Sequence, residues 1–391
     1  MECAYEESLY SIMHRVGKTK HRKEELYFFL KDAFSVDDEN HYEALTRVGR
    51  EKKPQTCIEV FVDRAEDLIA KDPNGYSDPY CMLGVQLGGG DDVGASDFYS
   101  RTVKQVVTTK VHKATLDPIW QEKFTLDVED VYSDLFHLEI WDEDAEKGNL
   151  VTSASKVIEV ASVKGLGRFF KEMAESTKGS AAQDDFLGCV TIPLRDIPSG
   201  GMNKWLDLTS RFSKSSSVRG RIKLEVLIRC RERRGKPVTD EYDTVRSVRL
   251  YETVLTLFAE QQLQHAESSS TWSGFIPALA MTILDQIAVQ KNVSPMQRAV
   301  SKWAVFCRIN TASQLDFALL LGILQDLNSQ WLHTTSHTPQ QENSVQTSFE
   351  EFIEYCLRLL AKHREVWPQA TAEGQTNMDY MLKFVVYQIT S

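Results

Sequence analysis

Two aspartates around a tight turn are the residues of this chain whose types and spacing most suggest chemistry. Asp72 and Asp78 lie six residues apart in the segment 71–80, which reads KDPNGYSDPY. The Pro-Asn-Gly sequence between them is typical of a turn. Such a turn can fold back so that both carboxylates point into one space. Carboxylate oxygens that share a space are ligands for a hard cation.

A second acidic pair and one further aspartate extend this set. Asp142 and Asp144 lie in the sequence WDED of residues 141–144 and fall on the same side of an extended chain, because side chains alternate along a strand. Asp185 directly precedes another predicted strand. Like charges about 4 Å apart repel by about 4 kcal/mol at an effective dielectric constant of about 20. A cluster of these carboxylates therefore predicts a bound cation.

Calcium is the cation that best suits carboxylates on loops. It accepts a flexible set of oxygen ligands, whereas magnesium requires a nearly ideal octahedron. An EF-hand is the competing calcium site, but it lies between helices and needs a glycine where a loop counted from Asp142 has Lys147. Each pair taken alone is also compatible with a solvated turn. The spacing of the pairs taken together favours a metal site.

The elements that must position these residues are predicted strands. Between residues 55 and 230, eight short segments are rich in β-branched and aromatic residues and are separated by Gly, Pro, Asp and Asn. They predict an eight-stranded antiparallel β-sandwich. The stretch from about 145 to 184 is too long for an ordinary loop and predicts a structured insertion. The eight predicted strands are 56–62, 80–87, 102–109, 120–126, 136–141, 187–192, 204–208 and 221–228.

Helical periodicity flanks the strands on both sides. In residues 1–50, apolar residues recur at three- and four-residue spacing and predict a helical hairpin. From 240 to 391 the same period returns, with capping sequences such as Ser294 followed by Gln297, and predicts five or six helices of an all-α domain. An apolar helix still runs at the end of the chain, so we expect this domain to be truncated. The predicted domains are 1–50, 55–230 and 240–391.

Four motifs, in this order, resemble those of a C2 domain. They are the segments 72–80 (DPNGYSDPY), 115–124 (TLDPIWQEKF), 141–144 (WDED) and 184–188 (DDFLG). The resemblance implies an eight-stranded sandwich with three loops at one end, which bind Ca²⁺ and dock on phospholipid. The long third-loop insertion is a departure from the pattern. By motif position, the resemblance implies the metal ligands Asp72, Asp78, Asp142, Asp144 and Asp185.

The order of the three regions resembles the Unc-thirteen vesicle-priming family. Segments 165–171 (GLGRFFK) and 185–193 (DFLGCVTIP) look closest to the branch that contains the brain-angiogenesis-inhibitor-associated protein and Unc-thirteen homologue D. This resemblance implies a role in priming or tethering of secretory and endosomal vesicles, with SNARE proteins as partners. It also implies that region 240–391 is the first part of a MUN domain.

Charge and cysteine usage narrow the expected function. The 45 Lys and Arg residues against 56 Asp and Glu residues give a formal charge of −11, which argues against nucleic acid as a partner. Bound calcium would reverse the sign of the charge locally and allow contact with anionic phospholipid membranes. The seven separated cysteines indicate a cytoplasmic protein.

Three aromatic side chains could contact the membrane. Tyr76, and in the insertion Phe169 and Phe170, could place apolar surface at the headgroups, although packing of the insertion on the sandwich explains Phe169 and Phe170 more simply. The resemblance to the vesicle-priming family implies peripheral association with the plasma membrane, secretory vesicles or endosomes.

Two other functions remain open at this stage. An enzyme targeted by its C2 domain is disfavoured, because the sequence lacks the G-x-S-x-G, P-loop, H-E-x-x-H and kinase motifs. We therefore predict that the protein is not an enzyme. A calcium-independent trafficking adaptor, whose sandwich and helices bind protein partners, is separated from the calcium-dependent membrane protein only by metal titration. The sequence does not indicate an oligomeric state.

Overall fold

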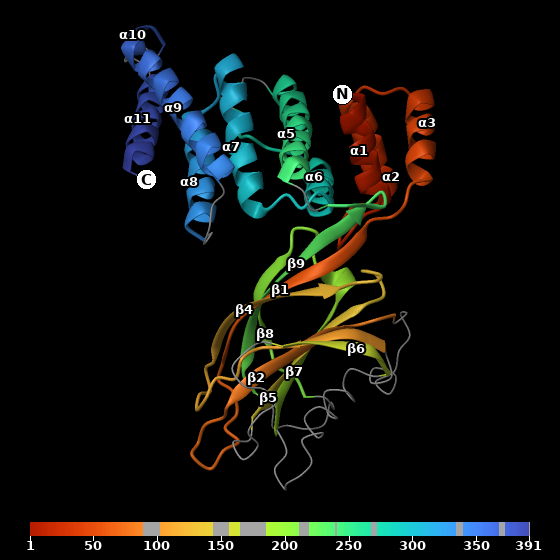
Figure 1. Ribbon diagram of the computed structural model, residues 1–391. Coiled ribbons are helices and arrows are strands. Elements are labelled where there is room, and N and C mark those ends of the chain that lie inside the picture. The colour runs from red at the N-terminus through yellow and green to blue at the C-terminus, as the bar shows by residue number, and fades with distance from the viewer. Residues whose placement is uncertain are drawn as a thin grey trace. The chain divides into compact units, whose positions relative to one another are not determined.

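The computed structural model divides the chain into two compact units. It describes residues 1–88, 102–143, 156–164, 185–210, 219–238, 241–266, 272–333, 339–366 and 372–390. The helical unit comprises Met1–Arg15, Lys20–Glu51 and Val238–Ser391, and the sandwich unit comprises Val16–Thr19 and Lys52–Pro237 (Figure 1). The chain therefore enters the sandwich unit twice, once for a few residues after the first helix and once for the whole domain.

The sandwich unit contains two antiparallel sheets. One has the strand order β10-β9-β1-β4, with β8 also paired to β9, and the other has the order β6-β3-β2-β5-β7. The first sheet is formed by β1 (Gln55–Glu66), β4 (Ile119–Asp127), β8 (Met202–Asp207), β9 (Arg221–Arg233) and β10 (Lys236–Pro237). The second is formed by β2 (Pro79–Gln86), β3 (Thr102–Thr108), β5 (Leu135–Asp142), β6 (Lys156–Lys164) and β7 (Asp185–Pro193).

The predicted antiparallel sandwich is confirmed, but its described part has ten strands where eight were expected. The two additional strands are β6, which lies inside the predicted insertion and pairs with β3, and the two-residue β10. Strand β9 alternates buried and less buried residues, as a strand with one face on the core should. Strand β2 is buried along its whole length, so this strand is covered on both faces.

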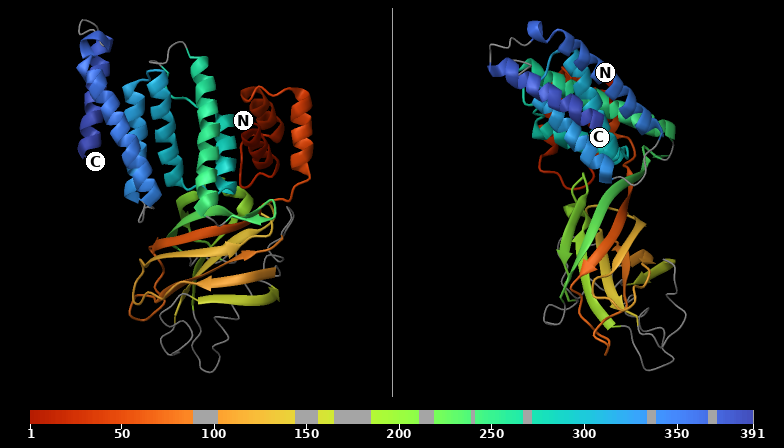
Figure 2. Two further views of the ribbon diagram at one scale, coloured as in Figure 1. Left: turned by 45° about the horizontal axis from the view of Figure 1, so that its top comes forward. Right: turned by 90° about the vertical axis from the view of Figure 1, so that its left-hand side faces the viewer.

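The helical unit has a single apolar core to which both ends of the chain contribute. The rings of Phe29 and Phe258 lie 5.4 Å apart, and the side-chain amide of Gln290 donates to the carbonyls of Ser11 and His14 at 2.9 Å. The described helices are α1 (Glu2–Met13), α2 (Lys23–Ala33), α3 (Asp38–Gly49), α5 (Glu241–Gln264), α6 (Ala278–Gln290), α7 (Pro295–Ala312), α8 (Phe317–His333), α9 (Pro339–Ala361), α10 (His363–Val366) and α11 (Ala372–Thr390). Figure 2 shows α5, α7 and α8 side by side in green to blue.

The N-terminal region has three helices where the periodicity predicted a hairpin of two. The third helix begins because the Asp37 carboxylate accepts a hydrogen bond from the backbone N–H of Asn40 at 2.8 Å, which caps the helix. Ser35 has a φ of 52°, a left-handed conformation that turns the chain between α2 and α3. The predicted cap at Ser294 is confirmed, since its side chain accepts from the N–H of Gln297 at 3.1 Å.

Candidate metal site

The connection between β1 and β2 holds Asp72 in a closed turn. The N–H of Asp72 donates to the carbonyl of Tyr76, and the N–H of Gly75 donates to the carbonyl of Asp72, both at 3.0 Å. Gly75 has a φ of +83°, which glycine adopts without the clash that a side chain would cause. The Ser77 hydroxyl is buried and donates to the carbonyl of Ile69 at 3.1 Å, which fixes the base of the turn.

Asp78 connects three segments at this end of the sandwich. Its carboxylate accepts a hydrogen bond from the N–H of Ala114 at 2.7 Å, in the connection between β3 and β4. Its backbone carbonyl accepts from the N–H of Glu143 at 3.0 Å, directly after β5. In addition, the N–H of Thr115 donates to the carbonyl of Ser77 at 2.9 Å. The ends of β1, β3 and β5 are therefore held together by backbone contacts around Asp78.

Asp142 is the last residue of β5 and lies in the middle of this arrangement. Its register partners are Pro79 on β2 and Asp185 on β7, so Asp142 and Asp185 are opposite each other on neighbouring strands. The residue is only 2% exposed, and its carboxylate accepts a hydrogen bond from the backbone N–H of Asp78. Asp185, in contrast, is exposed.

The electrostatic environment of Asp142 is unfavourable for a carboxylate. Burial raises the pKa of Asp142 to about 6, and the negative charges of Asp72 and Asp78 raise it as well, against the opposing effect of hydrogen bonds from Asp78 and Ser77. Within the described residues, neither Lys nor Arg forms an ion pair with Asp72, Asp78, Asp142 or Asp185. Three predicted ligands therefore interact with each other, and no Lys or Arg among the described residues pairs with them.

The structure places most of the predicted ligands at one end of the sandwich. Asp72, Asp78 and Asp142 interact there, Asp185 lies opposite Asp142, and Asp144 lies outside the described residues. In the part of the chain that the structure describes, no group of three or more His, Cys, Asp or Glu side chains is in position to hold a metal ion. The donors are all carboxylate oxygens, a set that fits a hard cation such as Ca²⁺. The five-residue ligand set stays a prediction.

Comparison with known proteins identifies the sandwich. Residues 56–163 match the model of the C2 domain family. The chain contains a C2 domain. It is also 34% identical to human BAI1-associated protein 3 and 31% identical to human protein unc-13 homolog D, over 98% of this chain in both comparisons. The predicted resemblance to this branch is confirmed.

The matches differ in how much of each relative they include. The chain spans about a third of the length of these curated relatives, 34% of BAI1-associated protein 3 and 35% of unc-13 homolog D. Among solved structures, a C2 domain of plant extended synaptotagmin 1 matches 48% of this chain and 100% of its own length, with 18% identity and a TM-score of 0.29.

Two exposed apolar side chains lie beside the acidic end of the C2 domain. Tyr76, at the tip of the first loop, is 49% exposed, as its predicted membrane contact requires. Ile119, at the start of β4, is 50% exposed and pairs in register with Arg64 near the same end. Sequence reasoning missed Ile119, although its position next to the buried Trp120 indicates an outward side chain. Phe169 and Phe170 lie outside the described residues.

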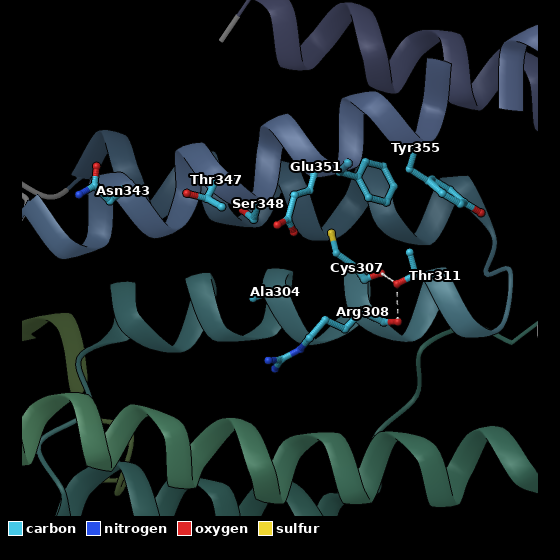
Figure 3. Close-up of a pocket in the computed structure, with 10 residues that line it drawn as sticks. Ala304, Cys307, Arg308, Thr311, Asn343, Thr347, Ser348, Glu351 and Tyr355 are labelled. Atoms are coloured by element: carbon cyan, nitrogen blue, oxygen red, sulfur yellow. Dashed lines mark hydrogen bonds between the residues drawn. The ribbon is translucent and has the colours of Figure 1, made fainter. Parts of the chain in front are cut away.

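The helical unit contains a pocket with a cysteine among its lining residues. This pocket between α7 and α9 has a volume of about 590 Å³. Figure 3 shows that Cys307, one of its lining residues, faces α9. Burial raises the pKa of the Cys307 thiol well above its usual value, which keeps it protonated. Arg308 forms an ion pair with Glu252 at 3.2 Å. That the protein is not an enzyme stays a prediction.

The length and apolar character of the helices show whether any of them could cross a membrane. Among the described residues, none of the helices combines the length and the apolar character that crossing a bilayer requires.

Proposed function

We propose that the C2 domain binds calcium through Asp72, Asp78 and Asp142, with Asp144 and Asp185 completing the ligand set, and that it then docks on anionic phospholipid membranes. The environment of Asp142 supports this most strongly. A carboxylate that is 2% exposed, lies among other carboxylates and has a pKa raised to about 6 is costly unless a cation joins it. The similarity to the C2 domain family supports the same assignment.

The loops are suited to a switch in the sign of the local charge. In the metal-free state, the acidic end is repelled by the negative surface of the cytoplasmic leaflet. Bound calcium would supply positive charge and coordination sites for lipid phosphate oxygens. Asp78 holds the three segments at a fixed separation, and Tyr76 and Ile119 offer apolar surface at the depth of the headgroups.

We further propose that the protein acts in vesicle priming, tethering, exocytosis or endosomal trafficking, as a cytoplasmic and peripheral membrane protein whose helical unit contacts SNARE proteins. The support is similarity over 98% of this chain to unc-13 homolog D and BAI1-associated protein 3. Binding of purified SNARE proteins by the full chain, measured in the presence of a calcium chelator, tests the role of the helical unit. Lack of binding would restrict the proposed function to the C2 domain.

Cosedimentation of the full chain with phosphatidylserine liposomes, at micromolar calcium and in EGTA, tests the membrane proposal. The wild type should sediment only with calcium, and the Asp142→Asn variant should remain in the supernatant. The asparagine amide oxygen can still accept from the Asp78 N–H, so the loop should keep its structure. Glu66→Gln is a matched control, because Glu66 lies in the same domain but pairs with Arg221 at 2.8 Å.

A calcium-independent adaptor is the second candidate. It is favoured by the finding that, within the described residues, a group of three metal-ligating side chains is not preassembled. Liposome or protein binding that is identical with calcium and with EGTA, and unaffected by Asp142→Asn, would support the adaptor and contradict the switch.

A further inference from the structure

A second candidate site lies in the helical unit, in a groove between α8 and α9. Its volume is about 360 Å³. The α9 residues that line it recur at three- and four-residue spacing, so they form one stripe along about three turns, or roughly 16 Å, of that helix. The described lining residues are Leu324, Leu327, Asn328 and Trp331 on α8, and Glu342, Val345, Gln346, Phe349, Glu350 and Ile353 on α9.

The floor of this α8–α9 groove is apolar, and apolar side chains continue beyond it. Both helices pack against α7 (Figure 1), and Leu324, Leu327 and Val345 are buried at the bottom. Leu357, one turn after Ile353 on the same face of α9, is 53% exposed, and Leu332, next to Trp331, is 76% exposed. Exposed leucines at the edges of an apolar groove are typical of a surface that contacts another protein.

The rim of the groove is acidic. Glu342 and Glu350 are both exposed and lie eight residues apart, which is about 12 Å along a helix. The sequences of α8 and α9 contain the acidic residues Asp326, Glu342, Glu350, Glu351 and Glu354, but only one Lys or Arg residue, Arg358. A ligand for this groove should therefore be apolar on one side and positively charged beside it.

We propose that the α8–α9 groove binds an amphipathic α-helix of another protein that carries Lys or Arg along its polar side. Leucine-sized side chains at i, i+3, i+4 and i+7 of such a helix match an apolar groove of this length. Basic residues about two turns apart on that helix would reach Glu342 and Glu350. An anionic membrane is a poor ligand here, because the acidic rim would repel it. The proposal does not depend on the calcium site.

Fluorescence anisotropy with a designed peptide tests the proposal. The probe is a labelled 18-residue helix with leucines on one face and lysines on the other, titrated with the full chain in EGTA. We expect saturable binding, weakened at least tenfold in the Glu342→Lys/Glu350→Lys variant. The Glu351→Lys/Glu354→Lys variant has the same change in net charge on α9 but alters residues outside the groove lining, and should bind within twofold of the wild type.

Two further measurements separate the contribution of apolar contacts to peptide binding from the contribution of charge. Ile353→Ser truncates the groove wall at a half-buried side chain and should weaken peptide binding about threefold to tenfold, while the helical circular dichroism stays unchanged. A peptide with glutamates in place of the lysines should not bind.

Several results would overturn the proposal. These are a wild type that does not bind the lysine peptide, an equal loss of binding in the two charge-reversal variants, and binding of the glutamate peptide. Light scattering that shows a dimer of the wild type, dissociated by Glu342→Lys/Glu350→Lys, would instead assign the groove to a second copy of this chain. Sedimentation with anionic liposomes in EGTA, lost in Ile353→Ser, would assign it to a membrane.

Discussion

Two sets of carboxylates in the C2 domain have opposite surroundings. Along β1, Glu59, Asp63 and Glu66 each have a basic partner from a neighbouring strand. The partner distances are 3.0 Å for Glu59–Arg229, 3.1 Å for Glu59–Lys123, 3.2 Å for Asp63–Lys223 and 2.8 Å for Glu66–Arg221. At the loop end, the charges among the described residues that act on Asp142 are those of Asp72 and Asp78.

The pKa values of the two sets reflect this difference. Burial acts to raise the pKa of Glu59, but Arg229 and Lys123 lower it by more, so the pKa lies below its usual value. The pKa of Asp142 is raised to about 6 by burial and by Asp72 and Asp78. Among the residues that the structure describes, the carboxylates along β1 are thus neutralised by basic partners and those of the loop end are not, as expected if a cation is bound only at the loop end.

Removing the uncompensated carboxylates should have the largest effect. In Asp78→Asn/Asp142→Asn, two ligand charges are lost while the side-chain oxygens can still accept the hydrogen bonds from Ala114 and Asp78. We expect calcium affinity, measured by isothermal titration calorimetry, to fall on the order of 100-fold. The control Asp63→Asn/Glu66→Gln removes two compensated charges and should leave affinity within threefold. Equal losses in the two variants would contradict the comparison.

Breaking a compensated pair should affect stability instead of metal binding. Arg229 and Glu59 are about one-fifth exposed, so Arg229→Met leaves a partly buried carboxylate with Lys123 as its remaining partner. The free energy of unfolding in urea should fall by about 1–2 kcal/mol. Glu59→Gln/Arg229→Met should recover part of that loss, because it removes a partly buried charge that has lost one of its two partners. A change in calcium affinity in either variant would contradict the view that the paired carboxylates act on stability alone.

The apolar neighbours of the loop carboxylates should contribute to membrane contact without contributing to metal binding. Tyr76→Ser removes a ring that is 49% exposed at the loop tip, and should weaken calcium-dependent liposome binding about fivefold, equivalent to about 1 kcal/mol. Tyr132, which is 52% exposed in the connection between β4 and β5 at the opposite end of the strands, provides the control Tyr132→Ser. Loss of binding in that control would place the membrane contact elsewhere.

The smallest effect concerns pH. With a pKa of about 6, Asp142 is ionised at pH 7.5 but only about one-quarter ionised at pH 5.5, so protons should compete with calcium as the pH falls. Calcium affinity should drop about fourfold over this range, with proton release on binding at pH 5.5. An ordinary aspartate would remain ionised throughout. The Asp142→Asn variant, if it retains measurable affinity, should show a flatter pH profile.

The sequence predicted the parts of the site that depend on local pattern. The turn at Gly75 and the strand that ends at Asp142 follow from residue types within a few positions of each aspartate. The two extra strands and the third N-terminal helix were not predicted. The pairing of β6 with β3 is a long-range event, and the turn between α2 and α3 uses a left-handed φ of 52° at Ser35, which residues other than Gly, Asn and Asp seldom adopt.

The sequence also did not predict which carboxylates have a basic partner among the described residues. Glu59 and Arg229 are 170 positions apart and meet only through the register of β1 with β9. In the same way, the burial of Asp142 depends on β2 and β7 on its two sides. Within a short stretch of sequence, Glu59 and Asp142 both look like acidic residues of a strand. Their different charged neighbours become visible only in the assembled sheets.

The pairing of Asp142 with Asp185 has a consequence for how this domain tolerates change. The two aspartates are fixed opposite each other by the β5–β7 ladder, although about forty residues separate them in the chain. The entropy of closing such a segment grows only logarithmically with its length, and each doubling costs about 0.6 kcal/mol. Insertions or deletions between β5 and β6, or between β6 and β7, can therefore accumulate at little cost in stability, while the sheet preserves the spacing of the two carboxylates.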